Sequence, residues 1–187
     1  MKPVFTRSAD KLLRVFLVVL VVSLAVAISF AWWLFSPPQA DVGYSPVQPV
    51  PYSHKLHAGD LGMDCRYCHT AVETSAMATV PATETCMNCH ARVKNQSPLL
   101  APVRESYATG KAIAWVRIHR LPDFVFFNHS VHISAGVGCA SCHGRVDQMI
   151  EVKQVEPLNM AWCLECHRRL AGTRGLSPPT HCSGCHR

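Results

Sequence analysis

The 187-residue sequence predicts a mainly α-helical protein with little regular structure, made of one long N-terminal helix and a loop-rich domain. Three observations support this fold class. Residues 15–35 hold no charged side chain, and the 151 residues after position 36 contain 12 of the 13 prolines and all 10 glycines. The same 151 residues contain all 10 cysteines and all 11 histidines. So much proline and glycine leaves little room for long helices or a sheet, so something other than side chains must fill the core.

The N-terminal segment has the length and the flanks of a membrane anchor. A spanning helix needs about 20 apolar residues, whereas the apolar region of a cleavable signal peptide has about 7–15. The run 15–35 follows four basic residues and contains Trp32 and Trp33 near its end, where an aromatic belt forms. We therefore expect residues 1–14 in the cytoplasm, 15–35 in the membrane and the rest in the periplasm. The alternative is a signal peptide cleaved after residues 25–27.

A proline-rich stretch follows the apolar run. Residues 36–52 contain five prolines, which predicts an extended, semi-rigid spacer between the membrane and a domain over 53–187. The same stretch could instead dock on a partner protein.

The cysteines all belong to five copies of Cys-x-x-Cys-His. This motif is the attachment signature of c-type haem, in which the two thiols bind the porphyrin and the histidine becomes the proximal ligand of the iron. Zinc sites and disulfides also use paired cysteines, but neither explains a histidine after every second cysteine. We therefore expect five covalently bound haem c to form the core of the domain. The cysteines are Cys65, Cys68, Cys86, Cys89, Cys139, Cys142, Cys163, Cys166, Cys182 and Cys185, and the proximal histidines are His69, His90, His143, His167 and His186.

Each iron has a second axial position, and the histidines outside the motifs are its main candidate ligands. Methionine is the other common axial ligand, and it raises the potential of a haem. His181, Met149 and Met160 are therefore possible alternative distal ligands. The predicted distal ligands are His54, His57, His119, His129 and His132.

The distal candidates and the motifs form an internal repeat. An aromatic residue precedes a His-x-x-His pair in Tyr52–His57 and again in Phe127–His132, 75 residues later. Repeat units of two motifs each thus cover about 53–95 and 127–170, and 171–187 add a fifth haem. Two histidines three residues apart lie on one side of a helical turn, so they can bind two different haems.

The net charge of +6 does not indicate a nucleic-acid partner. Of the 18 Lys and Arg, four precede the apolar run, and so does one of the 12 acids, which leaves 14 against 11 afterwards. Two propionates on each haem add further negative charge. The sequence also has no Ser-His-Asp pattern, phosphate loop or carboxylate pair, so we expect no catalytic residue and a role in electron transfer.

This layout resembles the small multihaem cytochromes of the c3 and c7 families. In those proteins the first histidine of a pair binds the haem that follows, and the second binds a neighbouring haem. The resemblance implies that His54 binds the haem of the first motif and His129 the haem of the third. It also implies that His57 and His132 bind other haems.

The sequence as a whole resembles the pentahaem cytochrome c subunit of alternative complex III, a bacterial quinol:electron-acceptor oxidoreductase. The resemblance lies in PYSHKLHAGDLGMDCRYCHTAVE (51–73), PATETCMNCH (81–90), residues 97–144 and NMAWCLECHR (159–168). It implies a single-pass protein of the bacterial inner membrane with a periplasmic haem domain. The implied partners are an iron–sulfur subunit, polytopic quinol-binding membrane subunits, and a monohaem cytochrome c or terminal oxidase as acceptor.

Two alternative functions fit the same motifs. One is a membrane-anchored quinol dehydrogenase that feeds periplasmic reductases. Such proteins place their first haem motif close to the membrane, whereas about 30 residues separate Phe35 from Cys65 here. The other is a free periplasmic carrier similar to cytochrome c7, which requires cleavage of the N-terminal segment.

Overall fold

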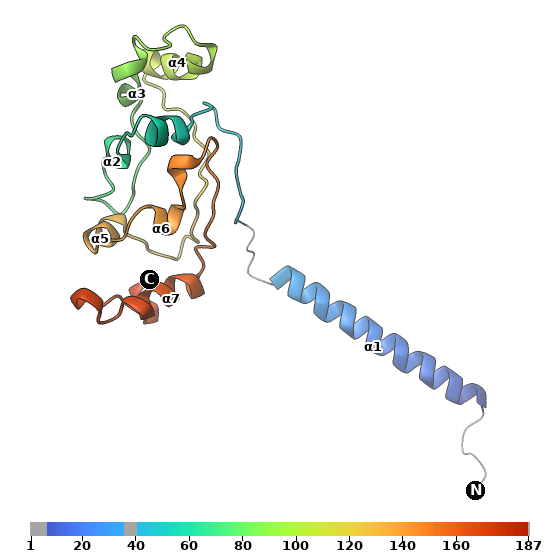
Figure 1. Cartoon of the computed structure of the whole chain (residues 1–187). Coiled ribbons are helices and arrows are strands. Elements are labelled where there is room, and N and C mark those ends of the chain that lie inside the picture. The colour runs from blue at the N-terminus through green and yellow to red at the C-terminus, as the bar shows by residue number, and fades with distance from the viewer. Residues whose placement is uncertain (1–6, 36–40, 187) are drawn as a thin grey trace. The chain divides into compact units, whose positions relative to one another are not determined.

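The chain divides into two compact units, one up to Gln39 and one from Ala40 onward (Figure 1). The computed structural model describes residues 7–35 and 41–186. The start of the predicted cytoplasmic segment (1–6), the first five residues of the predicted spacer (36–40) and Arg187 lie outside the described residues.

The first unit is the helix α1, Arg7–Phe35. It contains neither proline nor glycine, and at about 1.5 Å per residue its 29 residues are long enough to cross a bilayer. Ser8–Trp33 is the one span among the described residues with the length and hydropathy of a membrane helix. The prediction of one N-terminal apolar helix is thus confirmed, and both an anchor and a signal sequence have these properties.

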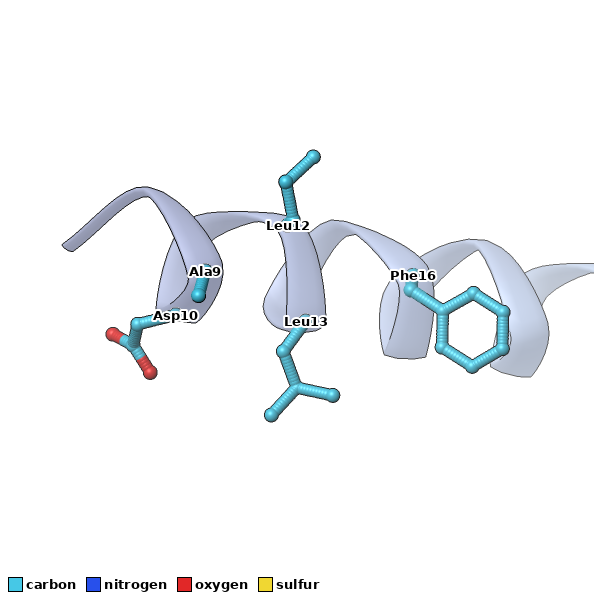
Figure 2. Close-up of a pocket in the computed structure, with 5 residues that line it drawn as sticks. All are labelled: Ala9, Asp10, Leu12, Leu13 and Phe16. Carbon is cyan, nitrogen blue, oxygen red and sulfur yellow. The ribbon is translucent and has the colours of Figure 1, made fainter. Parts of the chain in front are cut away.

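The groove shown in Figure 2 lies on α1 alone. Its walls are the side chains of Ala9, Asp10, Leu12, Leu13 and Phe16, which are neighbours along one helix. All of its lining residues belong to this one helix, so we assign no ligand site to it.

The second unit consists of short helices and turns joined by loops, and among residues 41–186 there is no strand beyond one isolated bridge between Val125 and His186. The predicted fold class, mainly helical with little regular structure, is confirmed. The helices are α2 Cys65–Cys68, α3 Thr83–His90, α4 Ala101–Thr109, α5 His129–Ser134, α6 Ala140–His143 and α7 Met160–Leu170. The turns are the π-helical η1 Lys55–Asp60 and the 3₁₀-helical η2 Pro98–Leu100, η3 Val146–Gln148, η4 Thr173–Gly175 and η5 Cys182–Gly184.

Short polar side chains start three of these helices. The side chains of Asp64, Asn128 and Asn159 each accept a hydrogen bond from a backbone N–H in the first turn of α2, α5 and α7. Such a cap stabilises a helix by about 1 kcal/mol, which matters for helices of 4 to 11 residues that cannot persist alone. The caps therefore fix the first residues of α2 and α7, which carry the first and fourth motifs, and of α5, which carries the second histidine pair.

The second unit has almost no hydrophobic core of its own. Among residues 41–186 the buried hydrophobic side chains are Val50, Val72 and Val103. A domain of this size normally buries well over half of the surface of its unfolded chain. The polypeptide therefore needs additional apolar material between its segments.

The described part of the predicted spacer, 41–52, is bonded to the second unit. Gly43 donates a backbone hydrogen bond of 2.7 Å to Gln154. The side-chain amide of Gln48 accepts from the backbone N–H of Val116 at 3.0 Å and donates to its carbonyl at 2.9 Å. The side-chain amide of Gln48 thus forms the two hydrogen bonds with the backbone of Val116 that a peptide of a neighbouring strand would form, because it has the same donor and acceptor as a peptide. Residues 41–52 of the predicted spacer are therefore hydrogen-bonded to segments around Val116 and Gln154.

The motifs are distributed along the second unit (Figure 1). Helices α3 and α4 lie at one end of it, α7 and the C-terminal segment lie at the other, and α2, α5 and α6 lie between them. The five motifs fall on α2, α3, α6, α7 and η5.

Candidate haem sites

Each motif sits on one helical turn, which holds its two cysteines and its histidine close together. In four of the motifs the Nδ1 atom of the histidine is bonded to a backbone carbonyl. The distances are 2.7 Å from His69 to Thr79, 2.9 Å from His90 to Val93, 2.7 Å from His167 to Pro179 and 3.3 Å from His186 to Phe124. Only an N–H can donate to a carbonyl oxygen, so Nδ1 carries the proton and Nε2 keeps a free lone pair. This is the tautomer that a metal-binding histidine needs.

The histidines of the two His-x-x-His pairs have the same arrangement. Nδ1 of His57 lies 2.8 Å from the carbonyl of Ser53, and Nδ1 of His132 lies 2.7 Å from that of Asn128. Both partners are four residues earlier in the chain. Nδ1 of His129 reaches the carbonyl of Ala76 at 2.8 Å. All three therefore present Nε2 as a lone-pair donor.

Three of these distal candidates face a motif histidine across a gap of nearly constant width. The ring centres are 6.2 Å apart for His57 and His90, 6.3 Å for His129 and His143, and 6.2 Å for His132 and His167. Two imidazoles that share one iron through Nε2 have centres about 6.2 Å apart, because each metal–nitrogen bond is about 2.0 Å and each nitrogen lies about 1.1 Å from its ring centre. The ring spacing of these three pairs therefore matches that of two axial histidines on one haem iron.

His54 is the remaining histidine of the first pair, and the motif histidine that acts on its charge is His69. The pKa of His54 is lowered to about 4, first by burial and then by the nearby charges of His69 and His57. Its Nδ1 atom is buried without a hydrogen-bond partner. At neutral pH the ring is thus uncharged, which is the form that binds a metal.

The structure places His119 beside the third motif. Its ring centre lies 4.4 Å from that of His143, at an angle of 89°, which is too close for an iron between them. The Nε2 atom of His119 is buried without a partner, and burial lowers the pKa of this histidine. His143 also has a pKa lowered to about 4, mainly by burial, then by His119, His129 and His69. The third motif therefore has two histidines beside its own.

The fifth motif has different surroundings. The ring of His186 faces Phe124, with centres 5.7 Å apart, and no other histidine ring of residues 41–186 is in ring contact with it. Of the alternative ligands, His181 is exposed and Met160 is 65% exposed. Met149 lies beside Gly144, next to the third motif. None of these three described residues forms a ring contact with His186 like those of the three pairs at 6.2–6.3 Å.

Two aromatic rings hold the histidine pairs, a role that the sequence pattern did not reveal. The ring of Tyr52 lies 4.8 Å from His54, edge to face, and 4.4 Å from His57, nearly parallel. The ring of Phe127 repeats this arrangement, at 4.7 Å and 4.4 Å from the first and second histidines of its own pair. The aromatic residue two positions before each first histidine was the only sequence signal of this packing.

None of the ten cysteines, all within residues 41–186, forms a disulfide, and burial raises the pKa of several of their thiols, including Cys86, Cys142 and Cys163. Among the described residues no three or more His, Cys, Asp or Glu side chains converge on one point as they do in a zinc site. The donors are arranged as facing histidine pairs beside pairs of thiols. This arrangement matches the needs of covalently attached haem.

Comparison with known proteins agrees with this geometry. The family model "Cytochrome c7 and related cytochrome c" matches residues 50–108 and 125–187, which include all five motifs. The multihaem cytochrome c subunit of the menaquinone reductase of Nitratidesulfovibrio vulgaris (strain Hildenborough) is 39% identical over 124 residues. The alignment covers 65% of this chain and 56% of that relative, so the chain spans little more than half of the relative's length. The histidine pairs, the thiols and the matched segments together show that the chain belongs to the family of cytochrome c7 and related cytochromes c.

Proposed function

We propose that this chain is a membrane-anchored pentahaem cytochrome c that conducts electrons within a quinone-reacting respiratory complex. The observation that supports this most strongly is the set of three histidine pairs with ring centres 6.2–6.3 Å apart. Each haem, when bound, supplies an iron that takes up and releases one electron at a time. A pair of axial histidines leaves an iron no open position for a substrate, so this geometry favours electron transfer over catalysis.

The residues of the chain have three tasks in this proposal. The ten cysteines attach the porphyrins, and the motif histidines bind the irons from one side. His54, His57, His129 and His132 bind four irons from the other side, and their backbone and aromatic contacts hold the rings in place. We further propose that the porphyrins fill the domain in place of the missing hydrophobic core.

Membership of a larger complex is the second part of the proposal. The relative is by its name a subunit of a menaquinone reductase, and the sequence resembles the pentahaem subunit of alternative complex III. We propose that α1 anchors the chain in the bacterial inner membrane with the haem domain in the periplasm. An iron–sulfur subunit and polytopic quinone-binding subunits would then be its partners in the same complex, with a monohaem cytochrome c or terminal oxidase as acceptor.

The direction of electron flow separates two candidate functions. The resemblance to alternative complex III favours oxidation of quinol, with electrons leaving towards the periplasmic acceptor. The name of the relative favours the reverse direction, in which electrons from the periplasm reduce menaquinone. Both require the same haem-binding residues in this chain, so the chain alone is compatible with either direction.

Purification of the native assembly tests this proposal. The chain should be extracted from membranes by detergent together with an iron–sulfur protein and polytopic subunits, and its intact mass should equal the polypeptide plus five haems. Quinol added to the oxidised complex should reduce the haems if the complex oxidises quinol. If the complex reduces quinone, chemically reduced haems should instead be reoxidised by added menaquinone. Recovery of the chain alone from the soluble periplasm would contradict the proposal and favour a free carrier, and recovery with a periplasmic reductase would favour the quinol dehydrogenase.

A further inference from the structure

We propose that the five motifs lie along the domain in the spatial order second, first, third, fourth, fifth. The second and fifth motifs are then the two ends at which partner proteins exchange electrons with the chain. This order differs from the order in the sequence, in which the first motif would be an end. The inference rests on the proposed function and deepens it, because it locates the two exchange sites.

The first and second motifs are joined by one turn of helix. Both histidines of the first pair lie on or next to η1, His54 at its start and His57 within it. The ring of His57 lies 6.2 Å from that of His90 of the second motif, and the charge of His69 of the first motif acts on His54. The side-chain amide of Asn88 in the second motif also donates a hydrogen bond of 3.0 Å to the hydroxyl of Tyr67 in the first. Because the two histidines are three residues apart, the sites of these two motifs are direct neighbours.

The third and fourth motifs are joined in the same way by α5. The ring of His129 faces His143 of the third motif at 6.3 Å, and the ring of His132 faces His167 of the fourth motif at 6.2 Å. The contact of Phe127 with both histidines holds the pair in one orientation. These two sites are therefore direct neighbours as well.

The two halves meet through the first and third motifs. The carbonyl of Ala76, in the loop that follows the first motif, accepts hydrogen bonds from the backbone N–H of His129 at 3.3 Å and from its Nδ1 at 2.8 Å. The backbone N–H of Ser130 donates to the carbonyl of Ser75 at 3.2 Å. Hence the same residue that faces the histidine of the third motif is bonded to the loop of the first.

The second motif lies away from this junction. Its helix, α3, packs against α4, and a hydroxyl–hydroxyl bond of 2.7 Å between Thr83 and Ser106 links the two helices. Figure 1 shows α3 and α4 together at one end of the domain, with α2 between them and α5 and α6. The long connection from the second motif to the third thus returns past the first motif.

The fifth motif adjoins the fourth at the opposite end. Nδ1 of His167 bonds at 2.7 Å to the carbonyl of Pro179, three residues before the fifth motif begins. The backbone N–H of Phe126 donates to the carbonyl of Cys185 at 2.8 Å, which ties the fifth motif to the segment just before α5. In Figure 1 the C-terminal segment lies with α7 at this end. Electron transfer slows steeply with distance. Electrons that a partner delivers at one end therefore reach the other end only by passing between the first and third motifs.

Locating the irons in the full-length holoprotein tests this order. The purified chain is imaged by cryo-electron microscopy in its complex, or crystallised and its irons located by anomalous scattering, and each iron is assigned through its thioether bonds. We expect the iron of the second motif to have one near iron neighbour, that of the first motif, and the iron of the first motif to have two. An arrangement in which the second and third motifs adjoin, or in which the first motif is an end, would overturn the proposal.

A matched pair of variants tests the order in solution. His57→Met changes a ligand at the proposed end site, and His129→Met makes the same change at the third motif, in the middle. The charge on one iron alters the potentials of its neighbours. NMR-resolved redox titration should therefore show one further haem shifted in His57→Met and two in His129→Met. Two shifted haems in His57→Met and one in His129→Met would overturn the order. Neither measurement needs quinone. A different order of the irons would therefore not contradict the proposed function, and purification without quinone-reacting subunits would not contradict the proposed order.

Discussion

Replacing His132 by methionine tests the distal ligands most directly. The structure places the His132 ring centre 6.2 Å from that of His167, at an angle of 34°. Its Nδ1 is held by the carbonyl of Asn128 at 2.7 Å, and its ring packs on Phe127 at 4.4 Å. In His132→Met a thioether sulfur takes the place of Nε2, while the proximal histidine and both thioether bonds of that haem stay unchanged.

The expected effects follow from these contacts. Axial ligands set haem potentials over a range of about 0.8 V, and methionine lies on the high side. Exchange of one ligand at one of five haems should raise a single midpoint potential by on the order of 0.1 V, which is about 2 kcal/mol for one electron. Loss of the Nδ1 hydrogen bond and of the Phe127 ring contact should lower the free energy of unfolding by about 1–3 kcal/mol.

Spectroelectrochemical titration and low-temperature EPR of the holoprotein measure these effects. One haem should titrate at a higher potential with an altered low-spin signal, and four should stay unchanged apart from small shifts in its neighbours. His181→Met is the matched control, because the His181 ring is exposed and makes no ring contact with another histidine among residues 41–186. If His132→Met and His181→Met both leave all five potentials and signals unaltered, His132 is not an iron ligand and the reasoning from ring spacing fails.

Three further predictions concern the turn that holds the first pair, the fifth motif and the N-terminal helix. A methyl group at Gly59 would overlap the backbone oxygen of the facing turn η3, so Gly59→Ala should destabilise the holoprotein by about 1–3 kcal/mol in thermal unfolding. Gly138→Ala, where there is open space and no left-handed backbone, should change it by less than about 0.5 kcal/mol, and equal stability of both variants would contradict the predicted clash. The iron bound by His186 should lack bis-histidine ligation, since the ring of His186 faces Phe124. The ferrous protein should therefore bind one carbon monoxide per chain, or the ferric protein should show one His/Met signal by EPR; five bis-histidine signals would refute this. If residues 15–35 span the bilayer, carbonate-washed membranes should retain the protein with its N-terminus intact, whereas a soluble form that starts near residue 28 would show cleavage.

Much of the chemistry could be predicted from the sequence because haem attachment is a local property. Cys-x-x-Cys-His places two thiols and a ligand on one helical turn, and no distant residue is needed to recognise it. The apolar run that predicts α1 is local too, since 21 consecutive uncharged residues need no tertiary partner to be recognised. The pairing of His57 and His132 with motifs further along the chain came from the resemblance to c3 and c7 cytochromes.

Distant contacts limited the other predictions. The assignment of His119 as a distal ligand stays a prediction, and the sequence did not indicate the contact that its ring makes with His143 at 4.4 Å. Nor did it indicate that His186 has no histidine ring against it among residues 41–186. The spacer role of the proline-rich segment also stays a prediction, and composition cannot reveal that Gln48 in this segment is hydrogen-bonded to the backbone of Val116, 68 residues away. These contacts join residues far apart in the sequence, so the secondary-structure propensity of neighbouring residues does not predict them.

The sequence by itself determined the type of group that this protein binds, haem c, and predicted five attachment sites, because each motif is complete within five residues. Only the tertiary structure decided which histidine faces which motif and how the motifs are arranged in space. The hydrogen bond from His129 to Ala76 joins the first motif to the third across 53 residues. The second motif, although it lies between them in the chain, packs with α4 at the end of the domain. The distances between histidine rings and the spatial order of the motifs depend on the packing of segments that are remote in sequence. No periodicity or spacing along the chain predicts them.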